Sequence, residues 1–271
     1  MIQFKFLPFL FLVFFANLNF GFSNTSIVLE DTIKPIPTIN KEFLISVNVF
    51  LDKRGKSNFD SSSLASALLR VNQIFEPIKA SFRMCEINYI QNFQYDTLNE
   101  YFRTESKIKY NLPNRINMYF AQELIVKTSD LKDICGYASS VVIDEGIPAI
   151  VIKKGCGNPG TLAHEIGHFF GLPHTFAGEG SELVDGSNCK TAGDRICDTP
   201  SDPYIDSEKV SDYVDDNCLF INIDRKDAKG NFYDPDVSNI MSYYLHCRCL
   251  KFTHGQYTEM VNFYKSNPYI W

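Results

Sequence analysis

Residues 161–176 read Thr161-Leu162-Ala163-His164-Glu165-Ile166-Gly167-His168-Phe169-Phe170-Gly171-Leu172-Pro173-His174-Thr175-Phe176. Two histidines four residues apart stand in an apolar stretch of helical character, so both imidazoles leave the same face of a helix. Gly171 can end that helix in a left-handed backbone conformation, and Pro173 prevents the helix from resuming. The pattern therefore predicts a helix whose two histidines are met by a third, His174.

The three histidines have the spacing of a catalytic zinc site. Neutral imidazole nitrogens bind zinc at about 2.0–2.1 Å, and a catalytic zinc takes three protein ligands and a water. The chain contains five histidines, and three of them fall within this short segment. Unrelated surface histidines explain that clustering poorly, so we expect His164, His168 and His174 to bind one Zn²⁺.

Glu165 is the predicted general base. It follows His164 by one residue, about 100° around the helix, so its carboxylate lies beside the open coordination position and not on the metal. Zinc lowers the pKa of a bound water toward about 7, and a neighbouring carboxylate can take the proton. A zinc-bound water beside a carboxylate base is best suited to the hydrolysis of amides.

Three further blocks follow the histidines. They are Gly193-Asp194-Arg195-Ile196-Cys197-Asp198-Thr199-Pro200, Asn239-Ile240-Met241-Ser242-Tyr243 and Phe252-Thr253-His254-Gly255-Gln256. The histidine pattern resembles the zinc signature of the metzincin metallopeptidases, and the second block resembles their Met-turn. In the order and spacing of all four blocks the chain resembles the pappalysin family, particularly its bacterial ulilysin-like branch.

The resemblance implies an α+β, metzincin-like fold. Its upper subdomain would hold a twisted mixed β-sheet with a backing helix and the active-site helix. Its irregular, disulfide-pinned lower subdomain would hold the Met-turn and a C-terminal helix. The implied activity is that of a secreted zinc endopeptidase, whose protein or peptide substrate lies extended along a sheet edge by strand addition. Residues 146–152 are the candidate edge.

The resemblance also implies roles for single residues. Met241 would form an apolar floor under the zinc, and Tyr243 would stabilise the oxyanion, unless it is a core tyrosine. Asp198 and Thr199 are candidate ligands of a structural Ca²⁺, which takes six to eight oxygens. The alternative for Asp198 is a helix or turn cap. Ser242 departs from the acidic residue that many relatives carry there.

Upstream of the histidines the chain predicts an α/β layer. Strands are expected at residues 43–50, 82–89, 115–120, 138–143 and 149–152, with a turn at residues 144–146. A helix is expected at residues 61–78 after a serine cap. Downstream, residues 174–239 show little periodicity, and a last helix is expected at residues 253–264.

Eight cysteines favour disulfides in an exported chain. We expect Cys135 to pair with Cys156, because they bracket a probable hairpin, and we expect Cys189, Cys197 and Cys218 to pin the long irregular segment. A cysteine-type zinc cluster is the alternative. The spacings of Cys189 to Cys197 and of Cys247 to Cys249 do not match that class.

The N-terminus has the order of a secretory signal peptide. The segment at residues 4–15 is almost wholly apolar, with Lys5 as its single charge, and gives way to polar and small residues, so we expect residues 1–23 to be a signal peptide. The alternative, a membrane anchor, would need about 20 apolar residues. Residues 24–40 are expected to be an extension or short pro-segment, without the cysteine that keeps some pappalysin relatives latent, and residues 41–271 the metallopeptidase domain.

Composition limits the other possibilities. The chain has 271 residues, 45% of them hydrophobic, and a net charge of −6. This charge disfavours nucleic acid as a partner, and no apolar run is long enough for stable membrane insertion. Two rival functions remain, namely a binding protein that keeps the frame but does not cut, and a zinc hydrolase of non-peptide amides. The intact Glu165 argues against the first, and the second would need a closed pocket.

Overall fold

The computed structural model describes residues 35–271, except residues 126–133, 140–147, 245–246 and 248–249. For residues 100–103 only the backbone is described. We call residues 36–169 the sheet half and residues 170–253 the loop half. Among the described residues, no helix is both long and apolar enough to cross a membrane.

The sheet half is built on one five-stranded mixed sheet with the order β2-β1-β4-β7-β6. Strands β1, β2, β4 and β7 run parallel, and β6 runs antiparallel to β7. Their bounds are Lys41–Phe50 for β1, Ala80–Ile90 for β2, Ile116–Ala121 for β4, Gly136–Ser139 for β6 and Ala149–Lys153 for β7. A separate pair joins β3 (Thr97–Leu98) to β5 (Glu123–Leu124). The predicted strands at residues 43–50, 82–89, 115–120 and 149–152 are confirmed, within two residues at each end. Strand β6 covers the first two residues of the strand expected at 138–143, and the rest of that strand and the turn expected at 144–146 lie outside the described residues.

The predicted substrate edge at residues 146–152 is wrong over residues 149–152, and residues 146–147 lie outside the described part of the chain. Strand β7, which occupies Ala149–Lys153, has β4 on one side and β6 on the other, so its backbone groups are already paired. Among the described residues, the outer strand on this side of the sheet is β6. The apolar run of β7 has the composition of a strand buried on both faces, which explains why its periodicity did not separate edge from centre.

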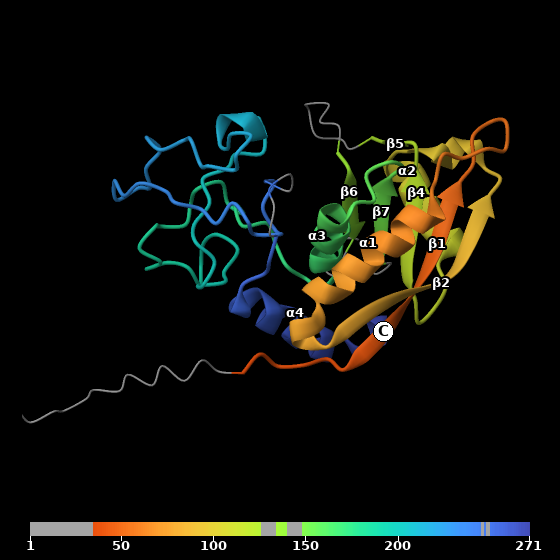
Figure 1. Ribbon diagram of the computed structural model, residues 1–271, viewed down its shortest axis with the longest axis horizontal. Coiled ribbons are helices and arrows are strands. Elements are labelled where there is room, and N and C mark those ends of the chain that lie inside the picture. The colour runs from red at the N-terminus through yellow and green to blue at the C-terminus, as the bar shows by residue number, and fades with distance from the viewer. Residues whose placement is uncertain (1–34, 126–133, 140–147, 245–246, 248–249) are drawn as a thin grey trace, which may run out of the picture. The chain divides into compact units, whose positions relative to one another are not determined.

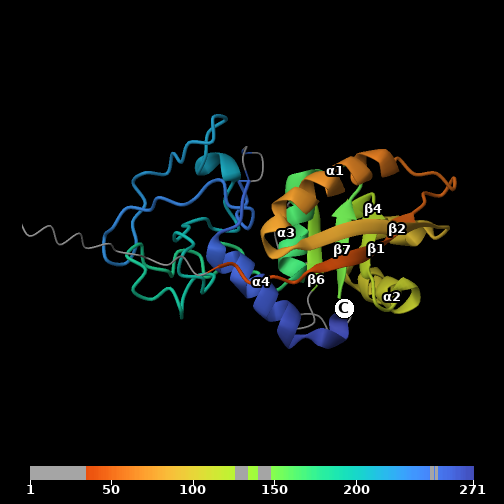
Figure 2. The ribbon, with the colours of Figure 1, turned by 60° about the horizontal axis from the view of Figure 1, so that its bottom comes forward.

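Both faces of the sheet are covered (Figures 1 and 2). Helices α1 (Ser61–Ile74) and α3 (Pro159–Phe169) pack on the face that receives Phe43, Ile45 and Val47. The opposite face receives Phe50 and Tyr119 and is covered by α2 (Glu100–Tyr110) and the 3₁₀ turn η2 (Phe93–Asp96). The first of these apolar cores therefore holds helix α3, which carries His164 and His168, against the sheet.

Two features differ from the sequence-based prediction. Helix α1 ends at Ile74, and residues 76–78 form the 3₁₀ turn η1 (Glu76–Ile78), because Pro77 lacks the N–H that a continued helix needs. Its N-cap is Asp60, whose carboxylate accepts the N–H of Ser62, and not a serine. Helix α2 was not predicted, since its sequence Glu-Tyr-Phe-Arg-Thr-Glu-Ser-Lys-Ile-Lys-Tyr is mostly polar.

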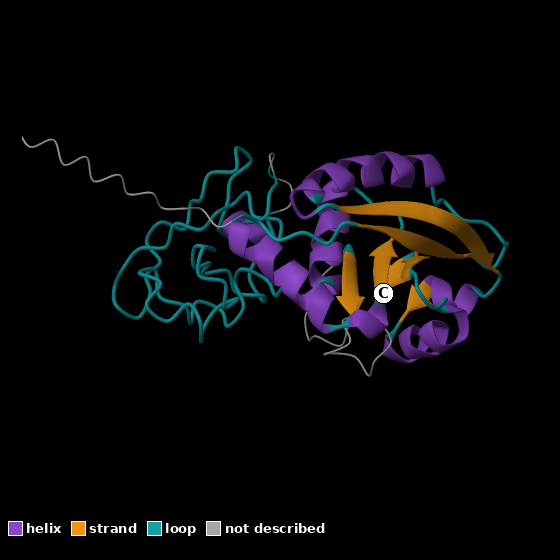
Figure 3. Ribbon diagram, turned by 90° about the horizontal axis from the view of Figure 1, so that it is seen from below, coloured by secondary structure: helices purple, strands orange, loops and turns teal. Residues whose placement is uncertain are grey.

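The loop half is irregular, as Figure 3 shows. Its described residues contain one helical turn, η3 (Val210–Asp212), and a small aromatic cluster. The predicted Cys135–Cys156 disulfide is present in the sheet half, and Cys189–Cys197 and Cys218–Cys247 crosslink the loop half. Helix α4 (His254–Ser266) and the turn η4 (Pro268–Ile270) follow and return to the apolar core, as the sequence predicts for the last helix.

Candidate metal centre and active site

Helix α3 positions two of the three histidines. The Asn158 side chain accepts the Thr161 N–H at 3.0 Å and caps its start, and Pro159 occupies the first turn. Gly171, with φ +85°, ends the helix, and its N–H donates to the His168 carbonyl. The chain reverses there, which brings His174 back to the helix.

The three imidazoles converge on one point. Nε2 of His168 lies 3.1 Å from Nε2 of His164 and 2.9 Å from Nε2 of His174. Nδ1 of His164 donates to the Ile240 carbonyl and Nδ1 of His168 to the Leu172 carbonyl, each at 2.7 Å. Because carbonyls only accept, the protons of these two rings are on Nδ1, and their Nε2 lone pairs face each other.

A zinc ion fits this arrangement. Burial lowers the pKa of His164 to about 3 and of His168 to about 4, so both rings are neutral, as metal ligands must be. Lone pairs at 2.9–3.1 Å repel unless a cation lies between them. Three nitrogens on a tetrahedral zinc are about 3.3 Å apart, from bonds of about 2.0–2.1 Å. Among the described residues this is the one cluster with such ligand geometry.

The segment that resembles a Met-turn, residues 239–243, packs against helix α3. Met241 is fully buried, and a Cβ at Gly167 would lie 2.5 Å from its sulfur, so this glycine lets the methionine pack against α3. Asn239 accepts the Met241 N–H and exchanges two amide hydrogen bonds with Gln256 of α4. Buried amides thus fix the segment whose carbonyl orients His164.

The Glu165 carboxyl is buried beside the histidines. Its Oε2 atom has no hydrogen-bond partner, and burial raises its pKa to about 8. Its Oε1 atom lies against the backbone of β6, where a Cβ on Gly136 would come within 3.0 Å. The carboxyl is therefore held in place by close packing, with one oxygen atom free to exchange a proton.

Tyr243 also lies at the site. Its ring is 4.7 Å from the His174 ring and 6.0 Å from the His164 ring, and it packs on Phe176 and Tyr204. Burial, with the charge of Asp206, raises its pKa, so the phenol keeps its proton and can donate a hydrogen bond.

The two residues predicted to bind calcium, Asp198 and Thr199, have different surroundings. Asp198 accepts from the Thr253 hydroxyl at 2.9 Å and from the Gly255 N–H at 2.7 Å, so it caps α4, which was the alternative role. The Thr199 hydroxyl is instead buried and has no hydrogen-bond partner. One carboxylate oxygen atom of Glu182 and one of Asp194 are also buried without a hydrogen-bond partner. The sequence analysis missed both carboxylates.

Burial keeps these two carboxylates partly protonated. It raises the pKa of Glu182 to about 7, helped by the Asp194 charge, and that of Asp194 to about 6. The Glu182 carboxylate lies over Gly193, where a Cβ would come within 1.9 Å of it. Gly193, in the same block as Asp194 and with φ +61°, was the signal in the sequence for this close approach.

Residues 104–265 match the peptidase family of pregnancy-associated plasma protein-A. An extracellular metalloprotease of Podospora anserina is 30% identical to this chain, over 39% of this chain and 29% of its own length. An extracellular metalloprotease of Aspergillus oryzae is 32% identical, over 39% of this chain and 37% of its own length. The chain thus spans about a third of these curated relatives. Mature mirolysin of Tannerella forsythia, solved with a cleaved peptide, shares the fold with a TM-score of 0.58 at 15% identity, over 86% of this chain and 95% of mirolysin.

Proposed function

The chain belongs to the peptidase family of pregnancy-associated plasma protein-A, and we propose that it is a secreted zinc-dependent endopeptidase. The observation that carries the proposal is the convergence of three Nε2 atoms, two of them with Nδ1 protons fixed by carbonyls. His164, His168 and His174 would hold the zinc. When bound, that ion supplies a Lewis acid that activates a water and polarises a carbonyl.

Glu165 moves the proton in this mechanism. Its unpartnered Oε2 accepts the proton of the attacking water and then donates it to the leaving amine. Close packing against β6 keeps the carboxylate from swinging away. Tyr243, stacked edge-on against His174, donates its hydroxyl proton as a hydrogen bond to the substrate oxygen on which charge develops.

The substrate would be a protein or peptide in extended conformation. Strand β6, the outer strand beside Glu165, offers backbone groups for strand addition in place of the segment expected from the sequence. The relatives named as extracellular metalloproteases support export, for which residues 1–23 would be the signal peptide and residues 24–40 a short pro-segment. Both segments lie largely outside the described residues.

A structural Ca²⁺ is a second part of the proposal. Glu182 and Asp194 are close enough for their charges to interact, and Thr199 is a neighbour of Asp194. One buried side-chain oxygen atom of each of these three residues has no hydrogen-bond partner. Ca²⁺ prefers oxygen ligands of this kind. Of the two ligands predicted from the sequence, this site keeps Thr199. It uses Glu182 and Asp194 in place of Asp198, whose carboxylate caps α4.

The test is cleavage of a mixed peptide library by the purified protein, with cut sites identified by mass spectrometry. We expect cuts at internal peptide bonds that a zinc chelator abolishes and added Zn²⁺ restores. A chain that binds one zinc and cuts neither peptides nor unfolded proteins would contradict the proposal and favour a binding protein. Cleavage of small non-peptide amides alone would favour the third function.

A further inference from the structure

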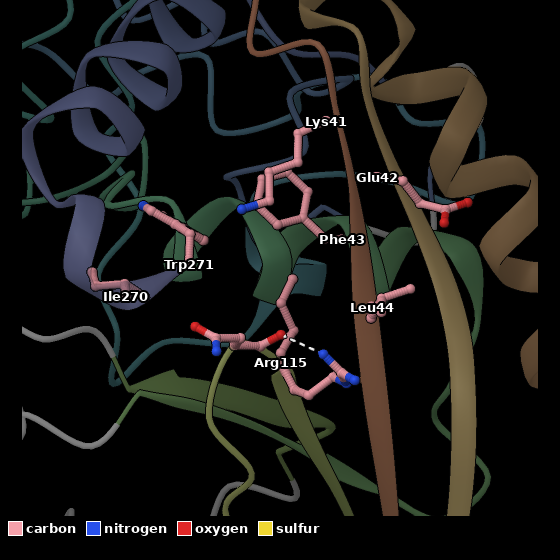
Figure 4. Close-up of a pocket in the computed structure, with 9 residues that line it drawn as sticks. Lys41, Glu42, Phe43, Leu44, Arg115, Ile270 and Trp271 are labelled. Carbon is pink, nitrogen blue, oxygen red and sulfur yellow. Dashed lines mark hydrogen bonds between the residues drawn. The ribbon is translucent and has the colours of Figure 1, made fainter.

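A pocket of about 220 Å³ lies at the N-terminal ends of β1 and β4, away from the metal centre (Figure 4). Lys41, Phe43, Arg115, Ile270 and Trp271 are among the residues that line it, and none of the three zinc-site histidines does. A pocket of this volume suits a small molecule.

The pocket carries positive charge that the protein does not neutralise. Arg115 donates one N–H to the Asn114 carbonyl at 2.9 Å, whereas its Nε is buried without a partner. The Lys41 ammonium lies over the rings of Phe43 and Tyr264, at 5.3 and 5.8 Å from their centroids. Within the described part of the chain, no carboxylate pairs with either cation.

The carboxylate at the rim is engaged elsewhere. Glu42 also lines the pocket, but it pairs with Arg83 on the neighbouring strand at 2.9 Å. Because this charge is compensated from outside, the two cations of the pocket remain unmatched. An anion would meet a guanidinium and an ammonium, the two side chains that bind carboxylates best.

The remaining wall is apolar. The Trp271 indole N–H donates to the Tyr264 carbonyl at 3.1 Å, so its polar atom is occupied, and its ring stacks on Phe170 at 4.8 Å. With Ile270 and Phe43 it offers carbon surface to a ligand. The pocket therefore pairs a cationic end with an aromatic and aliphatic wall.

We propose that this pocket binds a small carboxylate with an aromatic or branched aliphatic body. The carboxylate takes the N–H groups of Arg115 that Asn114 leaves unused and lies within the field of Lys41, and the body packs on Trp271. The site is distinct from the histidine cluster, and its occupation does not depend on peptidase activity.

Trp271 provides a specific reporter, because it is the single tryptophan of the chain. We would titrate the full chain with benzoate, benzamide and acetate at millimolar concentrations, following tryptophan fluorescence and the indole N–H resonance of ¹⁵N-tryptophan-labelled protein. Benzoate should give a saturable change. Benzamide lacks the charge and acetate lacks the body, so each should bind about tenfold more weakly or not at all.

The variants Arg115→Gln and Lys41→Gln test the cationic end. Arg115→Gln should weaken benzoate binding by about tenfold or more, since it removes a charge-assisted contact, and Lys41→Gln should weaken it less. Arg70→Gln, which removes the same charge from an exposed position of helix α1, should leave binding unchanged. Equal binding of benzoate and benzamide, no saturable signal, or unchanged affinity in Arg115→Gln would each overturn the proposal.

Discussion

The two halves of the molecule are held together by different interactions. In the sheet half, two apolar cores cover both faces of the sheet, and side chains such as Val47, Val71 and Ile150 are fully buried. In the loop half, Asp215 and Asp227 each accept N–H groups from the residues two and four positions further on, and two disulfides close the chain. Where apolar periodicity is missing, short polar side chains and crosslinks supply the order.

The candidate site lies where these two halves meet. His164, His168 and Glu165 come from α3 in the sheet half, whereas His174 and Tyr243 come from the loop half. The reacting groups that need precision are therefore on the rigid element, and the loop half completes the site. If this division holds, replacing Glu165 on α3 should reduce catalysis without unfolding, and opening a crosslink of the loop half should act through stability.

The largest expected effect is on catalysis. Glu165→Gln keeps the size of the side chain but removes the proton acceptor, so peptide cleavage should fall by about 10³-fold while one zinc stays bound. Cleavage rates and zinc content by atomic absorption would be measured together. Glu105→Gln, an exposed carboxylate of α2, is the matched control and should cut normally. Activity of Glu165→Gln within tenfold of the unaltered protein would refute the assigned role.

In the loop half, the largest expected effect is on stability. Replacing Cys218 and Cys247 together by serine opens a crosslink between residues 29 positions apart, which should lower the free energy of unfolding by about 3–4 kcal/mol. Urea unfolding would measure the change. The control is Cys85→Ser, which removes an exposed free thiol and should change stability by less than about 0.5 kcal/mol. Equal effects of the two changes would show that crosslinks do not hold the loop half.

Gly136 tests the contact between β6 and Glu165. A Cβ there would lie 2.9 Å from the Val151 carbonyl and 3.0 Å from Glu165 Oε1, so Gly136→Ala must displace the carboxylate or the strand. We expect kcat/KM to fall by about tenfold to 100-fold, because small misplacements of reacting groups are costly. Gly157→Ala, whose Cβ would meet only Phe120 at an ordinary 3.6 Å, should be neutral. Similar kinetics in both variants would remove Gly136 from the site.

Calcium should produce a moderate, pH-dependent effect. In the metal-free protein the pKa of Glu182 rises from 4.5 to about 7 and that of Asp194 from 3.8 to about 6. The native state then binds more protons than the unfolded chain, so stability falls as pH rises from about 4 to about 7. Ca²⁺ at ten times its Kd should add about 3–5 °C to the melting temperature near pH 7 and little near pH 4.

The control for calcium compares the calcium responses of the variants Asp194→Asn and Asp216→Asn at the same zinc concentration. The first removes a buried carboxylate of the proposed site and should abolish the calcium response, whereas the second removes an exposed one and should preserve it. A calcium response that persists in Asp194→Asn would place the ion elsewhere.

The sequence predicted more of the sheet half than of the loop half. The helical spacing of His164 and His168 and the alternation in β1 and β2 are local patterns, and they predicted elements that the structure contains. The position of β7 inside the sheet depends on its pairing with β4 and β6, which is not a local property. The same limit explains why the edge was assigned to β7 and not to β6, although both strands were predicted.

Carboxylates separated along the chain were also missed. Glu182 and Asp194 are twelve positions apart, and only the turn at Gly193 brings them together. Asp198 shows the reverse error, since a motif suggested a metal ligand where the fold uses a helix cap. Motifs therefore identified the residues on α3 and, beyond it, His174, Met241 and Tyr243, whereas no motif identified Glu182 and Asp194 as a pair.

The smallest expected effect concerns the link between the halves at α4. Thr253 caps this helix by accepting the Gln256 N–H, and Gln256 in turn accepts the Thr253 N–H. Thr253→Ala should therefore cost about 1 kcal/mol in urea unfolding. Thr258→Ala, inside the same helix, loses only a bond to the His254 carbonyl and gains helix propensity, so it should be near neutral. If both changes cost the same, the Thr253 cap contributes nothing, and α4 is held by its apolar packing and its contacts with Asp198 and Asn239.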